Sequence, residues 1–244
     1  MSDDGGAGRL DSKTAVVTGG SRGIGLGIAA ALLEAGANVV ICGTNQSHLD
    51  AARRTLRTGE KRLETVRADV RKRADVDRLI ATAVSRFGGL DILINNAGVG
   101  TFANVADLSD VDWQRMLDTN PTGVFYCCSA AIPKLRKRGG GWIINISSLA
   151  GKNPFVGGAA YGASKAGLNM FSETLMQEVR HDGIRVCYVM PGSVATEFLT
   201  PGAGDTNWML TPEDVARVVM DLLAQPDRSL PSRVELRPSR PPKR

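Results

Sequence analysis

Short runs of apolar, often β-branched residues alternate with longer helical patterns along most of the chain. The apolar runs cover residues 14–18, 38–42, 63–67, 91–95, 141–147 and 184–190. Between them, apolar side chains recur at intervals of three and four over residues 23–35, 46–57, 72–87, 111–138 and 161–181. This alternation predicts right-handed βαβ crossovers and a parallel sheet that carries helices on both faces.

The rest of the chain fits the same α/β architecture. Thr211 and the Pro-Glu-Asp that follows it predict the start of another helix, and residues 232–236 predict a last strand. We therefore expect a single Rossmann-like domain over residues 1–244, with a doubly wound parallel sheet of about seven strands. The two ends, residues 1–11 and 238–244, are expected to be flexible.

Composition excludes several classes of function. The net charge of +5 is modest and only 5% of the residues are aromatic, so nucleic acid is not an expected partner. No apolar run is long enough to cross a membrane and the first residues do not resemble a secretory leader, so a cytoplasmic protein is expected. No metal site is expected, because the histidines are scattered and four cysteines in apolar contexts predict core thiols: Cys42, Cys127, Cys128 and Cys187.

A glycine-rich segment, TGGSRGIG at residues 18–25, follows the first predicted strand and opens the first helix. Glycines at such a turn let the backbone approach a pyrophosphate, whose charge is met by amide groups and by the helix dipole. A tight turn without a ligand is the alternative interpretation. The candidate cofactor-binding residues of this turn are Gly19, Ser21, Arg22, Gly23, Ile24 and Gly25.

The end of the second predicted strand bears on the choice of cofactor. Enzymes that use NAD usually carry an acidic side chain here, where it binds the adenosine ribose. Residues 42–45 are CGTN, so no carboxylate would repel a 2′-phosphate. Thr44 can donate a hydrogen bond to a phosphate and Arg22 supplies a cation, although Arg22 could also be an ordinary surface arginine. We therefore expect NADP(H) to be preferred over NAD(H).

Tyr161 and Lys165 lie one helical turn apart on the same face of a predicted helix. A neighbouring cation favours the phenolate form of a tyrosine, whose pKa is ordinarily about 10, and so makes the phenol a plausible proton donor near neutral pH. Tyrosine and lysine share this spacing by chance on many helices. The pair gains significance here from Ser148, thirteen residues upstream, and from the glycine-rich turn.

With these motifs in order, the chain resembles the short-chain dehydrogenase/reductase family over about residues 12 to 196. Residues 95–98 (NNAG) and 191–196 (PGSVAT) are similar to two further elements of that family. Within the family, the glycine-rich turn and the GASKAG segment look most like β-ketoacyl-carrier-protein reductases and related NADP-dependent hydroxy-acid dehydrogenases.

The resemblance implies a catalytic tetrad of Asn120, Ser148, Tyr161 and Lys165. Tyr161 would be the general acid in reduction and the base in oxidation. Lys165 would lower the pKa of Tyr161 and hold the nicotinamide ribose, while Ser148 would bind the substrate oxygen. Asn120 would anchor a water that relays protons to Lys165. Ser147 is adjacent, but the thirteen-residue spacing selects Ser148.

The resemblance also implies cofactor contacts beyond the glycine-rich turn. Asp69 has a structural alternative, because it could cap the following helix, and the asparagine pair at 95–96 could instead satisfy backbone groups in a turn. The further cofactor-binding residues are Thr44, Asp69, Val70, Asn96, Ala97, Gly98, Tyr161, Lys165, Pro191, Gly192, Val194 and Thr196.

Two features depart from the family pattern. Pro121 and Pro133 interrupt the helical pattern at 111–138, which should therefore be bent or divided, and Pro121 could either alter the proton relay at Asn120 or aim this side chain inward. Residues 196–211 leave room only for a short loop where many relatives carry a longer lid. An open pocket is expected, and the substrate class is left undecided.

The sequence therefore predicts an NADP-dependent oxidoreductase that interconverts a carbonyl and a secondary alcohol by hydride transfer. A 3-oxoacyl-type substrate, free or linked to a carrier protein or coenzyme A, is the leading expectation. The alternatives are an NAD-dependent sugar, polyol or steroid dehydrogenase, an isomerase or dehydratase on the same core, and a non-catalytic cofactor-binding module. The resemblance also implies a homodimer or homotetramer that pairs through residues 111–138 and 161–181, with no membrane partner.

Overall fold

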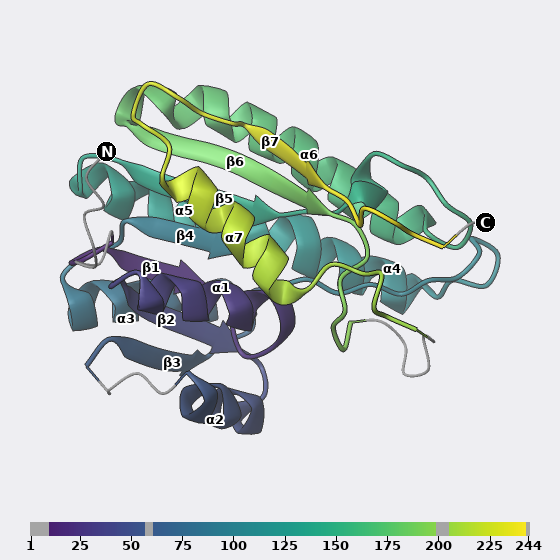
Figure 1. Cartoon of the computed structure of the whole chain (residues 1–244), viewed down its shortest axis with the longest axis horizontal. Coiled ribbons are helices and arrows are strands. Elements are labelled where there is room, and N and C mark those ends of the chain that lie inside the picture. The colour runs from purple at the N-terminus through teal and green to yellow at the C-terminus, as the bar shows by residue number, and fades with distance from the viewer. Residues whose placement is uncertain (1–9, 57–60, 199–204, 243–244) are drawn as a thin grey trace.

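The computed structural model describes residues 10–56, 61–198 and 205–242. Its centre is a seven-stranded sheet in the order β3-β2-β1-β4-β5-β6-β7, in which all neighbouring strands are parallel (Figure 1). The strands are β1 (Thr14–Val17), β2 (Asn38–Gly43), β3 (Leu63–Arg67), β4 (Ile92–Asn95), β5 (Gly141–Ile146), β6 (Ile184–Pro191) and β7 (Arg233–Leu236). The doubly wound, Rossmann-like sheet predicted from the sequence is confirmed.

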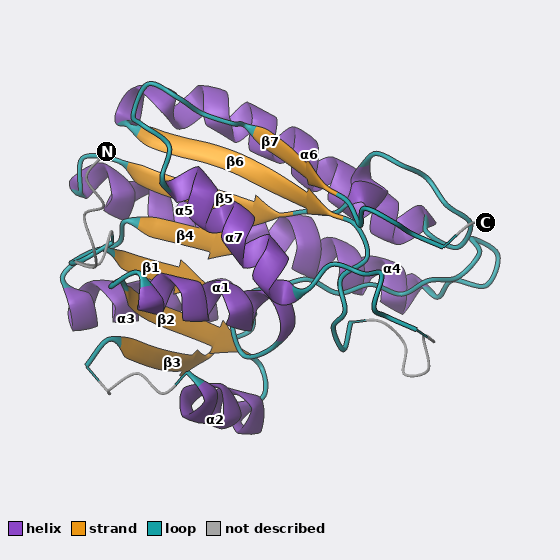
Figure 2. Ribbon diagram, in the orientation of Figure 1, coloured by secondary structure: helices purple, strands orange, loops and turns teal. Residues whose placement is uncertain are grey.

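Helices cover both faces of this sheet. In Figure 2 the helices α1 (Gly23–Glu34) and α7 (Pro212–Leu223) lie in front of the strands, and α2 (Gln46–Thr55) lies at the edge beside β3. The opposite face is covered by α3 (Arg73–Phe87), α5 (Gly123–Lys137) and α6 (Ala159–Val179).

Successive residues of the central strands feed two separate apolar layers. Val17 belongs to the same buried cluster as Ile28 of α1, whereas its neighbour Val16 belongs to the cluster that contains Leu79 of α3. Side chains alternate between the faces of a strand, and both faces are buried here because helices cover each of them. This arrangement explains why the predicted strands are continuous apolar runs rather than alternating ones.

The helical pattern predicted at 111–138 is divided. Helix α4 (Asp110–Leu117) passes into a π-helical turn at Asp118–Thr122, which contains Pro121, and α5 follows directly. A proline lacks an amide donor and clashes with the preceding turn, and the wider π-helical turn accommodates it. Pro133, in contrast, lies inside α5 without ending it, so only the first proline divides the helix.

The first described residue of the chain already contacts the fold. The amide of Leu10 donates to the carbonyl of Ala35 at 2.8 Å and its side chain is buried, so the core begins before the first strand. The remainder of the N-terminal segment expected to be flexible, residues 1–9, lies outside the described residues, as do 243–244 and residue 57 of the second predicted helix.

The four cysteines are confirmed as core thiols. All four are buried and form no disulfide, and burial raises the pKa of Cys42, Cys128 and Cys187 to about 12. They are therefore protonated near neutral pH and carry no thiolate chemistry. Within the described ranges, no helix combines the length and the apolar character that crossing a membrane requires.

Candidate active site

A cavity of about 1090 Å³ opens at the carboxyl ends of the strands. In doubly wound sheets a ligand crevice forms where the strand order reverses, which here is between β1 and β4. Of the predicted site residues, Gly25 and Asn120 are the two that lie behind the cavity wall. The others line it: Gly19, Ser21, Arg22, Gly23, Ile24, Thr44, Asp69, Val70, Asn96, Ala97, Gly98, Ser148, Tyr161, Lys165, Pro191, Gly192, Val194 and Thr196.

The glycine-rich turn has the shape of a phosphate cradle. Gly19 and Gly23 adopt positive φ angles of 62° and 52°, which side chains other than glycine rarely tolerate. A Cβ atom on Gly25 would lie 2.3 Å from the carbonyl oxygen of Gly19. Helix α1 begins after Arg22 without a hydrogen bond from that side chain, which leaves amides of the first turn for a ligand. These residues fit a bound pyrophosphate.

Asn96 fixes this turn against the end of β4. Its side-chain Nδ2 donates to the carbonyls of Thr18 at 3.0 Å and Gly19 at 3.1 Å, and the Thr18 hydroxyl accepts from the amides of Asn96 and Ala97. Asn95 is buried beneath the site and donates to Asn145 at 2.8 Å. The Asn96 side chain therefore shapes the turn, and Asn95 belongs to a buried amide network.

No acidic side chain stands at residues 42–45, at the end of β2, where an enzyme that uses NAD would usually carry one. Thr44 and Asn45 line the cavity wall there, and Asn45 accepts a hydrogen bond from the amide of His48 as the cap of α2. Asp69 does not cap α3, because that helix begins after Lys72. Instead Asp69 pairs with Arg71 at 2.6 Å, and this contact lowers the pKa of the Asp69 carboxyl.

The side chain of Arg22 reaches from the glycine-rich turn to the segment that follows β6. Its guanidinium pairs with Glu197 at 3.3 Å, and both side chains are exposed. An exposed pair of this kind contributes little to stability, so it can exchange for a phosphate partner at small cost. The pairing with Glu197 was not predictable from the sequence, because the two residues are 175 positions apart.

Helix α6 places Tyr161 and Lys165 together at the centre of the cavity. The Lys165 ammonium lies 5.9 Å from the centre of the Tyr161 ring and donates to the carbonyl of Ile146 at 3.0 Å. Burial lowers the pKa of Lys165 from 10.5 to about 8. Burial also raises the pKa of Tyr161, against the opposing effect of a hydrogen bond with Ser148. The pKa of Tyr161 is therefore shifted upward by burial, opposite to the lowering expected from Lys165.

The structure separates the roles of the two adjacent serines. Ser148 lies at the start of a 3₁₀ turn, where its hydroxyl accepts from the amide of Ala150 at 3.1 Å and lies against Tyr161. The hydroxyl of Ser147 is buried and donates to the side-chain oxygen of Asn169. Ser147 therefore supports the strand end, and Ser148 is the serine available to a substrate oxygen.

Asn120 lies in the π-helical turn and is fully buried. Its side-chain oxygen accepts from the amide of Val99 at 2.9 Å, and its nitrogen donates to the Val99 carbonyl and to the Ser164 hydroxyl, each at 2.9 Å. A Cβ atom on Gly98 would lie 3.3 Å from Asn120 Oδ1 and 3.5 Å from Lys165 Nζ. The side-chain amide thus positions the segment that follows β4 beside Lys165.

Three phenylalanines that the sequence patterns did not single out also line the cavity: Phe102, Phe155 and Phe198. We call them the aromatic wall. The ring centre of Phe102 lies 5.5 Å from that of Tyr161, and the ring centre of Phe198 lies 5.8 Å from it. All three lie in irregular segments, where no periodicity signals which way a side chain points.

Comparisons with known proteins agree with this geometry. The profile of the short chain dehydrogenase family matches residues 13–205. An uncharacterized oxidoreductase of Staphylococcus aureus (strain MRSA252) is 34% identical, and the match covers 94% of this chain and 98% of that protein.

Two solved structures are similar in fold and sequence. The closed form of serine dehydrogenase complexed with NADP+ aligns with a TM-score of 0.85 and 32% identity over 91% of this chain and 94% of that chain. The 3-ketoacyl-(acyl-carrier-protein) reductase from Brucella melitensis complexed with NADH aligns with a TM-score of 0.88 and 27% identity, over 94% of this chain and 98% of that chain.

A Rossmann-like α/β fold with a dinucleotide cradle beside a tyrosine and a lysine defines the class. The chain belongs to the short-chain dehydrogenase family. It is an oxidoreductase of that family, as its relatives are.

Proposed function

We propose that this protein is an NADP(H)-dependent carbonyl reductase and alcohol dehydrogenase that uses Ser148, Tyr161, Lys165 and Asn120. The observation that carries the proposal is the meeting of Ser148, Tyr161 and Lys165 in one cavity that also contains the glycine-rich turn. The retained polar groups argue against a non-catalytic cofactor-binding module, because such a module would not require a buried phenol and ammonium.

Each residue has a distinct task in the proposed mechanism. The nicotinamide, when bound, supplies a hydride to the carbonyl carbon. Ser148 holds the carbonyl oxygen, and Tyr161 donates its phenolic proton to that oxygen, which yields the alcohol. Lys165 would hold the nicotinamide ribose by a hydrogen bond, and it stabilises the phenolate that Tyr161 leaves behind. Asn120 positions the backbone beside Lys165, and the reverse sequence oxidises an alcohol.

NADPH consumption tests the proposed reaction directly. The protein with NADPH is offered a panel of ketones, 3-oxoacyl thioesters, ketosteroids and keto sugars, and NADPH absorbance is followed. Catalytic, substrate-dependent loss of NADPH supports the proposal. If NADPH binds but no member of the panel causes its consumption, a non-catalytic module is favoured instead.

The proposed preference for NADP(H) is supported by the cavity wall after β2. Gly43, Thr44 and Asn45 present no carboxylate, and Arg22 lines the same cavity. The two similar structures are complexed with NADP+ and with NADH, so the family accommodates both cofactors. The proposed preference therefore depends on whether Arg22 binds the 2′-phosphate of NADP(H).

Replacing Arg22 by alanine is expected to weaken NADPH binding about ten- to a hundredfold while changing NADH binding little, because a charge-assisted hydrogen bond to phosphate is worth about 1.5–3 kcal/mol. Dissociation constants for both cofactors measure the effect. Arg136→Ala is the matched control, since Arg136 is similarly exposed and pairs with Asp182 outside the cavity. Equal losses for NADPH and NADH would remove Arg22 from phosphate recognition.

The buried lysine predicts a pH dependence. The folded-state pKa of Lys165 is about 8, below its ordinary value of 10.5, so the ammonium that holds the ribose is lost as the pH rises through about 8. We expect kcat/KM for NADPH, which reports groups of the free enzyme, to fall above that pH. A profile that stays level until Tyr161 titrates would show that the charge of Lys165 does not matter for cofactor capture.

The wider setting of the enzyme is part of the same proposal. We propose a cytoplasmic homodimer or homotetramer that pairs through the α4–α5 segment and α6. Sedimentation velocity tests the oligomer, and a monomer at micromolar concentration would contradict it.

The two similar structures carry different substrate names, so the 3-oxoacyl expectation is supported by one of them only.

A further inference from the structure

The aromatic wall converges on the catalytic tyrosine from three separate segments. Phe102 follows β4, Phe155 follows β5 and Phe198 follows β6. The ring centres of Phe102 and Phe155 are 5.8 Å apart, and those of Phe102 and Phe198 are 6.4 Å apart. The three residues are nevertheless 43–45% exposed, because their free faces line the cavity. A gathering of exposed apolar rings beside reactive groups marks a surface for a ligand.

Gly100 allows these rings to meet. A Cβ atom at this position would lie 2.8 Å from Phe198 Cζ, 3.2 Å from Tyr161 Cδ2 and 3.3 Å from Phe102 Cζ. The backbone of Gly100 does not adopt a positive φ angle, so conformation alone does not call for glycine. The missing side chain instead leaves the space in which the two phenylalanine rings contact the tyrosine.

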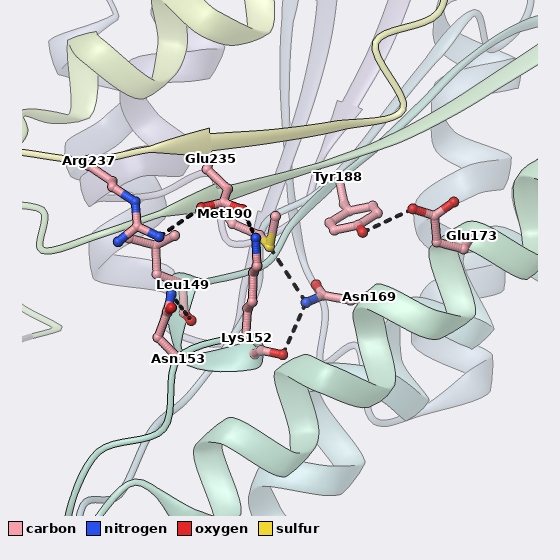
Figure 3. Close-up of polar contacts among 10 residues, drawn as sticks. Leu149, Lys152, Asn153, Asn169, Glu173, Tyr188, Met190, Glu235 and Arg237 are labelled. Atoms are coloured by element: carbon pink, nitrogen blue, oxygen red, sulfur yellow. Dashed lines mark hydrogen bonds and ion pairs between the residues drawn. The ribbon is translucent and has the colours of Figure 1, made fainter.

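The charged side chains of the described cavity lining already have protein partners near this wall. Arg115 pairs with Asp112 at 2.8 Å and donates to the Thr101 hydroxyl. Arg237, which also lines the cavity, pairs with Glu235, which in turn accepts from Lys152 (Figure 3). Arg22 pairs with Glu197 as described above. A substrate carboxylate beside Tyr161 would have to displace an acidic side chain from one of these guanidinium groups, at the small cost of an exposed ion pair, whereas the aromatic wall offers apolar surface directly.

We propose that the substrates of this site are ketones that carry an aryl ring directly on the carbonyl carbon, together with the corresponding secondary alcohols. The inference rests on the proposed function and names its substrate class. With the carbonyl oxygen on Ser148 and Tyr161, the ring lies against Phe102 and Phe198 in offset or edge contact. Hydride adds to the carbonyl carbon, the Tyr161 proton goes to the oxygen, and a neutral aryl carbinol leaves.

Three methyl ketones that differ only in the second substituent test this class. Acetophenone carries a phenyl ring, pyruvate a carboxylate, and S-acetoacetyl-N-acetylcysteamine a thioester-bearing methylene. The kcat/KM values are measured with saturating NADPH. We expect acetophenone to be the best substrate despite the more electrophilic carbonyl of pyruvate. A preference for pyruvate or for the thioester overturns the aryl assignment and leaves the proposed reaction intact.

Variants of the aromatic wall distinguish a loss of aryl-ketone recognition from a general loss of activity. We expect Phe102→Ala and Phe198→Ala each to lower the acetophenone-to-pyruvate ratio of kcat/KM by about tenfold, as the loss of one pocket contact typically does. The matched control is Phe87→Ala, because Phe87 ends α3, outside the α4–α5 segment and α6, and does not line the cavity. Its ratio should equal that of the wild type. Equal losses for all ketones in the wall variants would overturn the assignment.

A binding measurement keeps the inference independent of turnover. Calorimetric titration of 1-phenylethanol into the Tyr161→Phe variant saturated with NADP+ should show binding, and Phe102→Ala in the same background should weaken it about tenfold. Binding that depends on Phe102 without any ketone reduction by the wild type would sustain the aryl site and contradict the proposed reaction. The absence of binding would contradict the aryl site itself.

Discussion

The Tyr161→Phe variant is expected to lose about 10²- to 10⁴-fold in kcat, the usual contribution of a positioned general acid. The substitution removes one hydroxyl and leaves the ring that packs against Phe102 and Phe198. Fold and NADPH affinity should therefore be nearly unchanged. Steady-state kinetics with the best ketone, together with a thermal unfolding midpoint and a cofactor dissociation constant, measure the three quantities.

Tyr188→Phe is the matched control for this variant. The Tyr188 hydroxyl donates to Glu173 at 3.0 Å (Figure 3) and Tyr188 does not line the cavity, so the substitution removes the same phenolic hydroxyl without touching the site. Its kcat should equal that of the wild type. A Tyr161→Phe enzyme that kept more than about a tenth of the wild-type kcat, with the same pH profile, would require another proton donor.

The Lys165→Met variant is expected to lose both turnover and cofactor affinity, because one ammonium is assigned to the phenolate and to the ribose. Removing its charge-assisted hydrogen bonds should weaken NADPH binding about ten- to a hundredfold. Methionine has a similar shape but no charge, and burial of the charge disfavours the folded state below the pKa of about 8. At neutral pH the unfolding midpoint should therefore not fall.

Lys134→Met, at an exposed position of α5, controls for the loss of a lysine. It should leave both the kinetics and the NADPH dissociation constant unchanged. A Lys165→Met enzyme with lower turnover but wild-type cofactor affinity would restrict Lys165 to the phenolate and remove it from ribose binding.

The sheet could be predicted because the hydrophobic pattern of each strand and helix is a local, periodic property of the sequence. Runs such as residues 38–42 and 184–190 are apolar on both faces, and only a strand covered by helices on both sides buries such a run. The register, the ends of the helices and the tolerance of Pro133 inside α5 depend on packing across the domain. Sequence patterns therefore divided the helix at Pro121 correctly and could not exclude a division at Pro133.

Most of the candidate site could be predicted for a related reason. Carboxyl ends of parallel strands meet at one edge of a sheet, so motifs that follow β1, β4, β5 and β6 converge in space. Ser148 and Tyr161 are brought together by this topology. The direction of the Tyr161 pKa shift could not be predicted, because it is set by burial in three dimensions, which a spacing of one helical turn does not reveal.

The aromatic wall shows what sequence patterns miss. Phe102, Phe155 and Phe198 occupy loops without periodicity, and the approach of Phe102 and Phe198 to Tyr161 depends on the absence of a side chain at Gly100. A phenylalanine in a loop gives no sign of whether it faces solvent, a core or a substrate. The proposed substrate class therefore depends on three-dimensional positions that the motifs do not encode.

Isotope transfer tests the central claim most directly. The wild-type enzyme is incubated with a ketone of the panel and NADPH deuterated at the transferring position of the nicotinamide, and the alcohol is analysed by mass spectrometry. The account predicts one deuterium on the former carbonyl carbon, and in the same time only a trace of labelled alcohol with Tyr161→Phe. Bound NADPH that transfers no deuterium to any ketone of the panel, or equal labelling by the two enzymes, would contradict it.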